Sequence, residues 1–305
     1  MNLMRSGLTR YTVGLPVILC VTLLATTADF RQPQNLINFG GQIAALLIVS
    51  LGQMFVTLTA GIDLSVGSVV NLASCIVATQ PDPFAGVALA LAVGAMVGLV
   101  NGLGVAYANV HPLVMTLSTA TFLQGLSYLV LPIPGGHVAP ALTWLATGTA
   151  MGVPLSFVWC AVAVGAVAAG IGRSRFGLHL FAVGSHPRSA HLNGVRVMAT
   201  VITAYVLCSL MAVAAGIYLA ARVAAGDPGL GAEFGLESVA AVALGGVQLT
   251  GGIGSAGGVL AGALSLGLLT NGLNLFGVSP FMRGVVTGFL LLAAVSMQRR
   301  RVVGL

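Results

Sequence analysis

The chain has 305 residues, of which 57% are hydrophobic and only 6% charged, and its mean hydropathy is +1.04. Soluble domains are about a quarter charged, so this composition argues against a soluble fold, a disordered chain and a secreted disulfide scaffold. All 12 basic residues are arginine. A chain without lysine cannot form the P-loop that binds ATP phosphates, or attach pyridoxal phosphate as a Schiff base. Energy from ATP would have to come from another chain.

Ten apolar segments follow one another along the chain. They cover residues 11–28, 37–58, 64–79, 84–106, 112–131, 151–171, 197–221, 237–250, 256–276 and 280–297. Because a spanning helix needs about 20 apolar residues, we predict an all-α, polytopic membrane protein with about ten transmembrane helices. We expect one permease domain, 1–305. Residues 64–79 and 237–250 are short and flanked by glycines, which predicts broken or re-entrant helices. No small-residue cleavage motif follows the first segment, so we expect it to remain uncleaved.

The charged residues predict an orientation for these segments. With ten spans and a cytoplasmic N-terminus, nine of the 12 arginines face the cytoplasm, and five of the six acidic residues face outside. This agrees with the positive-inside rule and places the C-terminus in the cytoplasm too. We therefore expect a multi-pass protein of a bacterial inner membrane. The arginines gather between apolar segments, which indicates membrane orientation and no nucleic-acid partner.

Uncharged polar side chains inside the apolar segments are candidates for a translocation path, because such residues usually face the protein interior. They are Gln42, Gln53, Asn71, Asn101, Gln124, Gln248, Asn271 and Asn274. Amides donate and accept hydrogen bonds without a counter-ion, which suits a neutral polyhydroxylated solute. The alternative is hydrogen bonding between helices. An ion-coupled secondary transporter would need an acid or base in mid-span, and a passive channel would need no ATP.

The remaining residue patterns predict no metal or cofactor site. The five histidines and four cysteines lack the spacing of metal ligands, so we predict no metal site and no cofactor in this chain. Glycines repeat every fourth residue at 94, 98 and 102 and at 254, 258 and 262, which predicts close helix packing. The sequence Leu-Thr-Ala-Gly-Ile at 58–62 returns as Leu-Thr-Gly-Gly-Ile at 249–253, which predicts two related halves around a central path.

The longest polar stretch, residues 172–196, is predicted to be cytoplasmic. Pro187 favours the first turn of a short helix that ends near Leu192, before Asn193 and Gly194. This stretch is either an ordinary interfacial loop or a docking helix for a cytoplasmic partner.

Several blocks resemble the ribose-type ABC importer permeases, a group that also includes branched-chain amino acid permeases. They are Phe176-Gly177 with Ala182-Val183-Gly184, Ala190 and Gly194-Val195; residues 58–68; Ala243-Leu244-Gly245-Gly246 with residues 251–255; and Asn271-Gly272. The resemblance spans about residues 38–297. It implies a non-enzymatic permease subunit that dimerises with an identical or a paired subunit. It also implies a cytoplasmic ABC ATPase, which holds ATP and Mg, and a periplasmic or extracellular solute-binding protein.

The resemblance also implies roles for individual residues. Coupling to the ATPase falls to Arg175, Phe176, Gly177, Gly184, His186, Arg188, Ala190 and Gly194. The motif turns contain Gly61, Asp63, Ser65, Gly67, Gly251, Gly252 and Gly254. His186 replaces the family's usual Asn and Ser189 its usual Ala, which leaves the choice of ATPase partner open. The outward loops 131–149 and 222–235 are expected to meet the binding protein through Arg222, Asp227 and Glu233. We predict a sugar importer, with a branched-chain amino acid permease or an ion-coupled transporter as alternatives.

Overall fold

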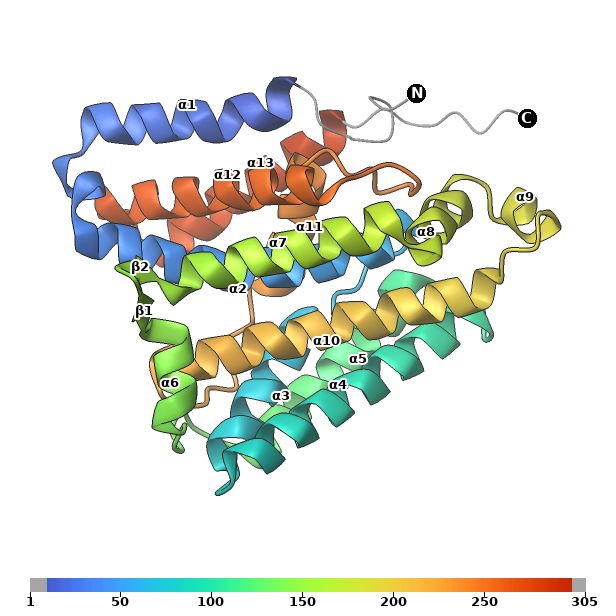
Figure 1. The fold of residues 1–305 in the computed structure, drawn as a ribbon, viewed down its shortest axis with the longest axis horizontal. Helices are drawn as coiled ribbons and strands as arrows, with labels where there is room; N and C mark the ends of the chain where they lie inside the picture. Colours follow the sequence, from blue (N-terminus) through green and yellow to red (C-terminus); the bar gives the residue numbers. More distant parts are fainter. Residues whose placement is uncertain (1–9, 298–305) are drawn as a thin grey trace.

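A computed structural model describes residues 10–297, and it is helical apart from one small hairpin (Figure 1). The elements are α1 (Arg10–Thr26), the 3-10 helix η1 (Ala28–Arg31), α2 (Pro33–Leu58), α3 (Val66–Thr79), α4 (Pro83–Ala106), α5 (Pro112–Val130), α6 (Pro140–Thr147), β1 (Thr149–Ala150), β2 (Val153–Pro154), α7 (Leu155–Arg173), α8 (Arg175–Ser185), α9 (Pro187–Leu192), α10 (Val197–Val223), α11 (Phe234–Leu244), α12 (Ala256–Leu275) and α13 (Pro280–Met297). Strands β1 and β2 pair in antiparallel fashion.

The long helices lie side by side along the longest axis of the molecule (Figure 1). Helix α6 and the hairpin lie at one end, with η1, and we call this the α6 end. Helices α8 and α9 lie at the opposite end, the α9 end. The two ends therefore carry different elements, although the helices between them run in both directions.

Six helices are long and apolar enough to cross a membrane: α2, α4, α5, α7, α10 and α12. Four more apolar helices, α1, α3, α11 and α13, are shorter. Each of the ten predicted segments overlaps one of these helices. The all-α, polytopic membrane fold is therefore as predicted, while the number of crossings depends on how the shorter helices sit in the bilayer.

Three predicted boundaries were wrong. The segment 237–250 was predicted as one helix, but α11 begins at Phe234 and ends at Leu244. Residues beyond it turn because Gly246, Gly251 and Gly252 adopt positive φ angles, which break a helix. The outward loop 131–149 contains α6, and the polar stretch 172–196 contains α8 as well as the predicted α9.

Helix α2 forms the centre of the bundle, and 94% of its most apolar window is buried. Helix α10 packs beside it and also against α4, where the glycine stripe lies. A methyl group on Gly98 would stand 2.6 Å from Cα of Val206, and one on Gly102 would stand 2.8 Å from Cα of Ile202. These approaches confirm the prediction that the stripe serves helix packing.

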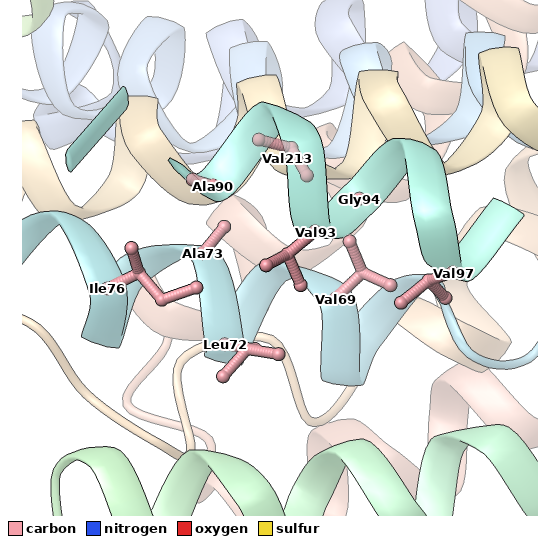
Figure 2. Close-up of a pocket in the computed structure, with 9 residues that line it drawn as sticks. All are labelled: Val69, Leu72, Ala73, Ile76, Ala90, Val93, Gly94, Val97 and Val213. Carbon is pink, nitrogen blue, oxygen red and sulfur yellow. The ribbon is translucent and has the colours of Figure 1, made fainter. Parts of the chain in front are cut away.

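A small apolar crevice remains between α3 and α4 where they face α10 (Figure 2). It is lined by Val69, Leu72, Ala73, Ile76, Ala90, Val93, Gly94, Val97 and Val213, and its volume is about 10 Å³. A cavity of this size holds one water at most, and this one offers no polar partner for it. The crevice therefore belongs to the core and cannot be a path for a solute.

Two short helices meet near the middle of the bundle. Helix α3 runs from there towards the α6 end, and α11 runs towards the α9 end. Their first turns are in contact, because a methyl group on Gly67 would stand 2.5 Å from the carbonyl oxygen of Gly231 and 3.3 Å from the backbone nitrogen of Gly235. Each short helix follows a long one, α2 or α10, through a non-helical connection. The chain thus contains two oppositely directed broken-helix units.

Candidate functional site

At the α9 end, α8 turns back from α7 through a tight corner. Ser174 caps α8 by accepting a hydrogen bond from the backbone N–H of Gly177 at 3.1 Å. Gly177 is buried against Ile171, whose carbonyl a methyl group would overlap. Phe176 packs on Phe55 of α2 with ring centroids 6.3 Å apart. The corner fixes α8 against α2 and α7.

The end of α8 meets both copies of the sequence repeat. The backbone N–H of Gly252 donates to the carbonyl oxygen of Leu58 at 3.0 Å. Gly184 lies between them, because a methyl group there would overlap that carbonyl and stand 2.6 Å from the nitrogen of Gly252. A methyl group on Gly251 would stand 2.9 Å from the nitrogen of Ala60. We call these residues, 58–60, 184–185 and 251–252, the α8 junction.

The two repeat copies therefore contact each other and do not occupy equivalent positions. Residues 58–62 follow the long helix α2, whereas 249–253 follow the short helix α11. The other connection that leads from a long helix to a short one is 224–233, which follows α10. The relation between two halves stays a prediction, because the repeated letters do not occupy equivalent places in the fold.

Helix α9 stands out from the α8 junction. Its contact with the body is Ala190, which is buried. Arg175, His186, Arg188 and Gly194 are exposed, and so is the apolar side chain of Leu192 (79%). The predicted coupling residues therefore divide into buried or half-buried ones, Phe176, Gly177, Gly184 and Ala190, and exposed ones on or near α9.

The connection after α2 is held by a buried polar network. Oδ1 of Asp63 accepts hydrogen bonds from the backbone N–H of Ser65 at 2.9 Å and from its hydroxyl at 2.6 Å. The amide of Gln53 faces the backbone of Asp63, with both groups paired at 3.0 and 3.1 Å in its favourable orientation. Asn101 donates to Oγ of Ser65 at 2.9 Å and accepts from Thr119 at 2.7 Å. The network joins α2, α3, α4 and α5.

Gly61 and Gly67 serve this connection by their small size. A methyl group on Gly61 would stand 2.8 Å from the hydroxyl of Tyr205, and Gly67 contacts Gly231 as described above. Gly254 packs on Val247 in the turn before α12, where a methyl group would meet the valine side chain at 2.9 Å. These glycines allow backbones to approach each other closely.

The second connection, residues 224–233, enters the bundle from the α6 end along α3. The backbone N–H of Gly231 donates to Oδ1 of Asn71. Asn71 in turn donates to Oε1 of Gln124 at 2.8 Å, and Nε2 of Gln124 donates to the carbonyl of Pro228 at 2.7 Å. The hydroxyl of Ser74 donates to the carbonyl of Asp227 at 3.0 Å. Three polar side chains of α3 and α5 thus hold this loop in place.

The eight proposed path residues are spread over the molecule. Gln53, Asn71, Asn101 and Gln124 belong to the networks above, and Asn271 exchanges hydrogen bonds with Asn35. Gln248 lies half-buried in the turn after α11, Gln42 is exposed, and exposed Asn274 accepts from Arg283 at 3.5 Å. Most of these amides join helices, and they do not line one continuous cavity.

A larger cleft lies towards the α6 end, between α2, α10, α11, α12 and α13. Its volume is about 230 Å³, and it is lined by Gln42, Ile43, Leu46, Leu219, Arg222, Glu233, Phe234, Glu237, Gly267, Thr270 and Arg283. It brings together Gln42 with two of the residues proposed to dock the binding protein, Arg222 and Glu233. The third, Asp227, lies outside the cleft and accepts from the backbone of Gly229 at 2.7 Å.

Glu237, Arg283 and Thr270 were not among the predicted site residues. Their grouping depends on how α11, α12 and α13 pack, and no local motif marks it. The network partners Ser74, Thr116, Thr119 and Asn35 were missed for the same reason. Thr116, for example, lies on α5 and accepts from the backbone N–H of Leu64 at 3.1 Å. Within residues 10–297, no three His, Cys, Asp or Glu side chains gather in a way that could hold a metal ion.

Comparison with known proteins shows the family of the chain. The family described as "Branched-chain amino acid transport system / permease component" matches residues 35–295. The chain belongs to this family. It is 33% identical over 291 residues to the ribose import permease protein RbsC of Bacillus subtilis, covering 93% of this chain and 90% of that one.

Two further relatives have similar coverage. The RbsC protein of Escherichia coli is 34% identical over 297 residues, covering 94% of this chain and 92% of its own. The galactose/methyl galactoside import permease protein MglC of Haemophilus influenzae is 31% identical over 305 residues, covering 92% and 91%. No solved structure matches the chain significantly. The relatives are transport permeases and not enzymes, and the ion-coupled alternative is not favoured.

Proposed function

We propose that this chain is the membrane subunit of an ATP-binding-cassette importer that carries a sugar or a related neutral polyhydroxylated solute. The observation that carries the proposal is the similarity, over at least nine tenths of both chains, to permeases named for ribose import. The family also takes its name from branched-chain amino acid transport. The relatives named for sugars favour a sugar over an amino acid.

The distribution of charge supports an orientation with the α9 end in the cytoplasm. Arg173, Arg175, Arg188 and Arg196 lie at that end, without an acidic residue in α8 or α9. The acidic residues Asp29, Asp82, Asp227 and Glu233 lie towards the other end, where three arginines accompany them. Under the positive-inside rule, the α6 end then faces outside. Ten crossings in a bacterial inner membrane, with both termini in the cytoplasm, complete this part of the proposal.

In this orientation α9 is the docking helix for a cytoplasmic ABC ATPase, which holds ATP and Mg. Its exposed side chains would contact the ATPase, and its base is joined through the α8 junction to the ends of α2 and α11. A displacement of α9 therefore acts directly on both broken-helix units. Alternating access would follow if the two units open the bundle at one end at a time. This subunit would bind no cofactor of its own.

The remaining partners lie on other faces. The α6 end, with the loops 131–149 and 222–235, would receive the solute-binding protein, with the half-buried Asp227 as an acidic contact. Arg222 and Glu233 contribute to that loop but also line the cleft. A second permease subunit, identical or paired, would complete the importer within the bilayer. Residues 1–305 would act as one permease domain.

The proposal is tested by uptake in proteoliposomes that contain the permease, its ATPase and its binding protein. We expect ATP-dependent uptake of D-ribose or D-galactose, and none without ATP. Leu192→Glu should abolish uptake but leave the permease folded, because this side chain is 79% exposed. Met151→Glu, at a fully exposed site in the hairpin at the other end, is the matched control. Uptake without ATP, or undiminished uptake by Leu192→Glu, would contradict the proposal.

A further inference from the structure

The cleft at the α6 end is much larger than the crevice between α3 and α4. We propose that it is the resting site of the solute inside the permease, and that Glu237 is its central hydrogen-bond acceptor. The inference rests on the proposed function, because it names where the transported solute lies. It replaces the expectation of a path lined by amides with a site of four charged side chains around one amide and one hydroxyl.

The polar groups of the cleft match a solute that both donates and accepts hydrogen bonds. Glu233 and Glu237 are acceptors, Arg222 and Arg283 are donors, and Gln42 and Thr270 can do both. With all four groups ionised, the two positive and two negative charges cancel, so the site then offers no net attraction for an ion. A neutral sugar, with a hydroxyl on nearly every carbon, can bond to all of these groups without bringing a charge into the bilayer.

Most of these charges already have a partner, but Glu237 does not. Arg283 pairs with Glu233 at 3.4 Å, and Nη2 of Arg222 donates to the carbonyl of Asn38 at 3.3 Å. The charges of Glu233 and Arg283 act on the carboxylate of Glu237 through space. That carboxylate forms no hydrogen bond or ion pair with any described residue. A half-buried carboxylate in an apolar helix is costly unless something bonds to it. Solute hydroxyls are the groups that this cleft would admit.

The floor of the cleft is apolar and shaped by small residues. Ile43, Leu46, Leu219 and Phe234 line it, and Gly267 leaves room beside Ile43. Sugar rings present C–H faces as well as hydroxyls, and an aromatic or aliphatic floor receives those faces. The volume of about 230 Å³ is below the usual range of about 300–1,000 Å³ for drug-sized ligands, which favours a small solute.

The position of the cleft connects it to the moving parts. Phe234 and Glu237 lie in the first turns of α11, the short helix whose other end leads into the turn that reaches the α8 junction. Glu233 ends the loop that Asn71 and Gln124 hold against α3. A shift of α11 would therefore move Glu237 and Phe234 relative to Gln42 on α2 and change the contacts of the cleft with the solute.

The test measures uptake of radiolabelled D-ribose and D-galactose by the complete reconstituted transporter, with L-leucine as a third probe. Glu237→Gln removes the charge at nearly constant size, and Gln42→Ala removes an amide at the exposed mouth, where folding does not depend on it. We expect Glu237→Gln to raise the KM for uptake at least tenfold and Gln42→Ala to raise it about threefold. Asp29→Asn, an exposed acid at the same end outside the cleft, is the control and should match the wild type.

The possible outcomes distinguish the cleft assignment from the proposed sugar function. If the wild type takes up a sugar and both cleft variants keep its KM, the cleft is not the resting site, while the proposed function stands. If the wild type takes up neither sugar, or takes up leucine alone, the sugar function itself fails and the cleft assignment fails with it. A raised KM in both variants, with ATPase activity stimulated by the binding protein kept within twofold, supports the cleft.

Discussion

At the scale of single residues, the α8 junction depends on the absence of side chains. Gly184 lies between the carbonyl of Leu58 and the nitrogen of Gly252, and Gly251 and Gly252 adopt φ angles of +84° and +76°. Each residue brings a backbone group of one element within hydrogen-bond reach of another. A junction made of backbone atoms is short and more rigid than one made of long side chains. A displacement of α8 is therefore transmitted directly to α2.

Gly184→Ala should damage this junction. Its methyl group would overlap the Leu58 carbonyl, so α8 must move away, and overpacking of this kind costs about 1–3 kcal/mol. We expect a lower melting temperature in detergent and a loss of most ATP-dependent uptake. Gly170→Ala in α7 is the control, because nothing lies within 4 Å of the added methyl group. Equal uptake and melting temperature in the two variants would show that the junction tolerates the extra atom.

At the scale of elements, the two broken-helix units explain why short apolar helices exist at all. The 14 residues of α3 are about 21 Å long at 1.5 Å per residue, which is less than the apolar thickness of a bilayer, about 30 Å. The connection 59–65 lies largely inside the bundle and 224–233 enters it from the α6 end, so the buried backbone groups of both find partners in the protein. Non-helical backbone at such depth is stable only when it is enclosed in this way.

Asn71→Ala should release the loop 224–233 from α3. The substitution leaves the N–H of Gly231 and the amide oxygen Oε1 of Gln124 without partners, and an unpaired buried polar group costs about 1–3 kcal/mol. We expect faster proteolysis at residues 224–233 in the detergent-solubilised protein, together with a lower melting temperature. Asn274→Ala removes an exposed amide with one long contact and should change neither. A proteolysis rate equal to the wild type would mean that the loop is held by its backbone packing alone.

The sequence predicted most of the helices but few of the residues that form the cleft. Hydrophobic runs located every apolar helix, and Pro187 with Asn193 and Gly194 located α9, because these signals are local. The end of α11 was missed because its apolar run continues past Leu244 while the backbone turns at glycines. The cleft was missed because Gln42, Glu237 and Arg283 come from three helices that are far apart in the chain. Only packing brings such residues together.

At the scale of the whole molecule, the two ends differ in charge and in shape. The α9 end carries arginines and a protruding helix, and the α6 end carries acidic residues, the hairpin and the mouth of the cleft. A solute that enters at the cleft and a partner that drives transport from α9 would therefore act on opposite sides of the membrane. The broken-helix units lie between these sides and connect them.

This polarity predicts the result of cysteine labelling in intact cells. The four natural cysteines are first replaced by alanine, and a single cysteine is then placed in α9 by Arg188→Cys or in the hairpin by Met151→Cys. Both positions are exposed, so the reagent reaches each thiol from its own side without disturbing the fold. With nine arginines on the cytoplasmic side, a membrane-impermeant maleimide should label the hairpin thiol in whole cells. It should label the α9 thiol only after the membrane is opened. Labelling of Arg188→Cys from outside would reverse the orientation, and with it the side on which an ATPase could dock.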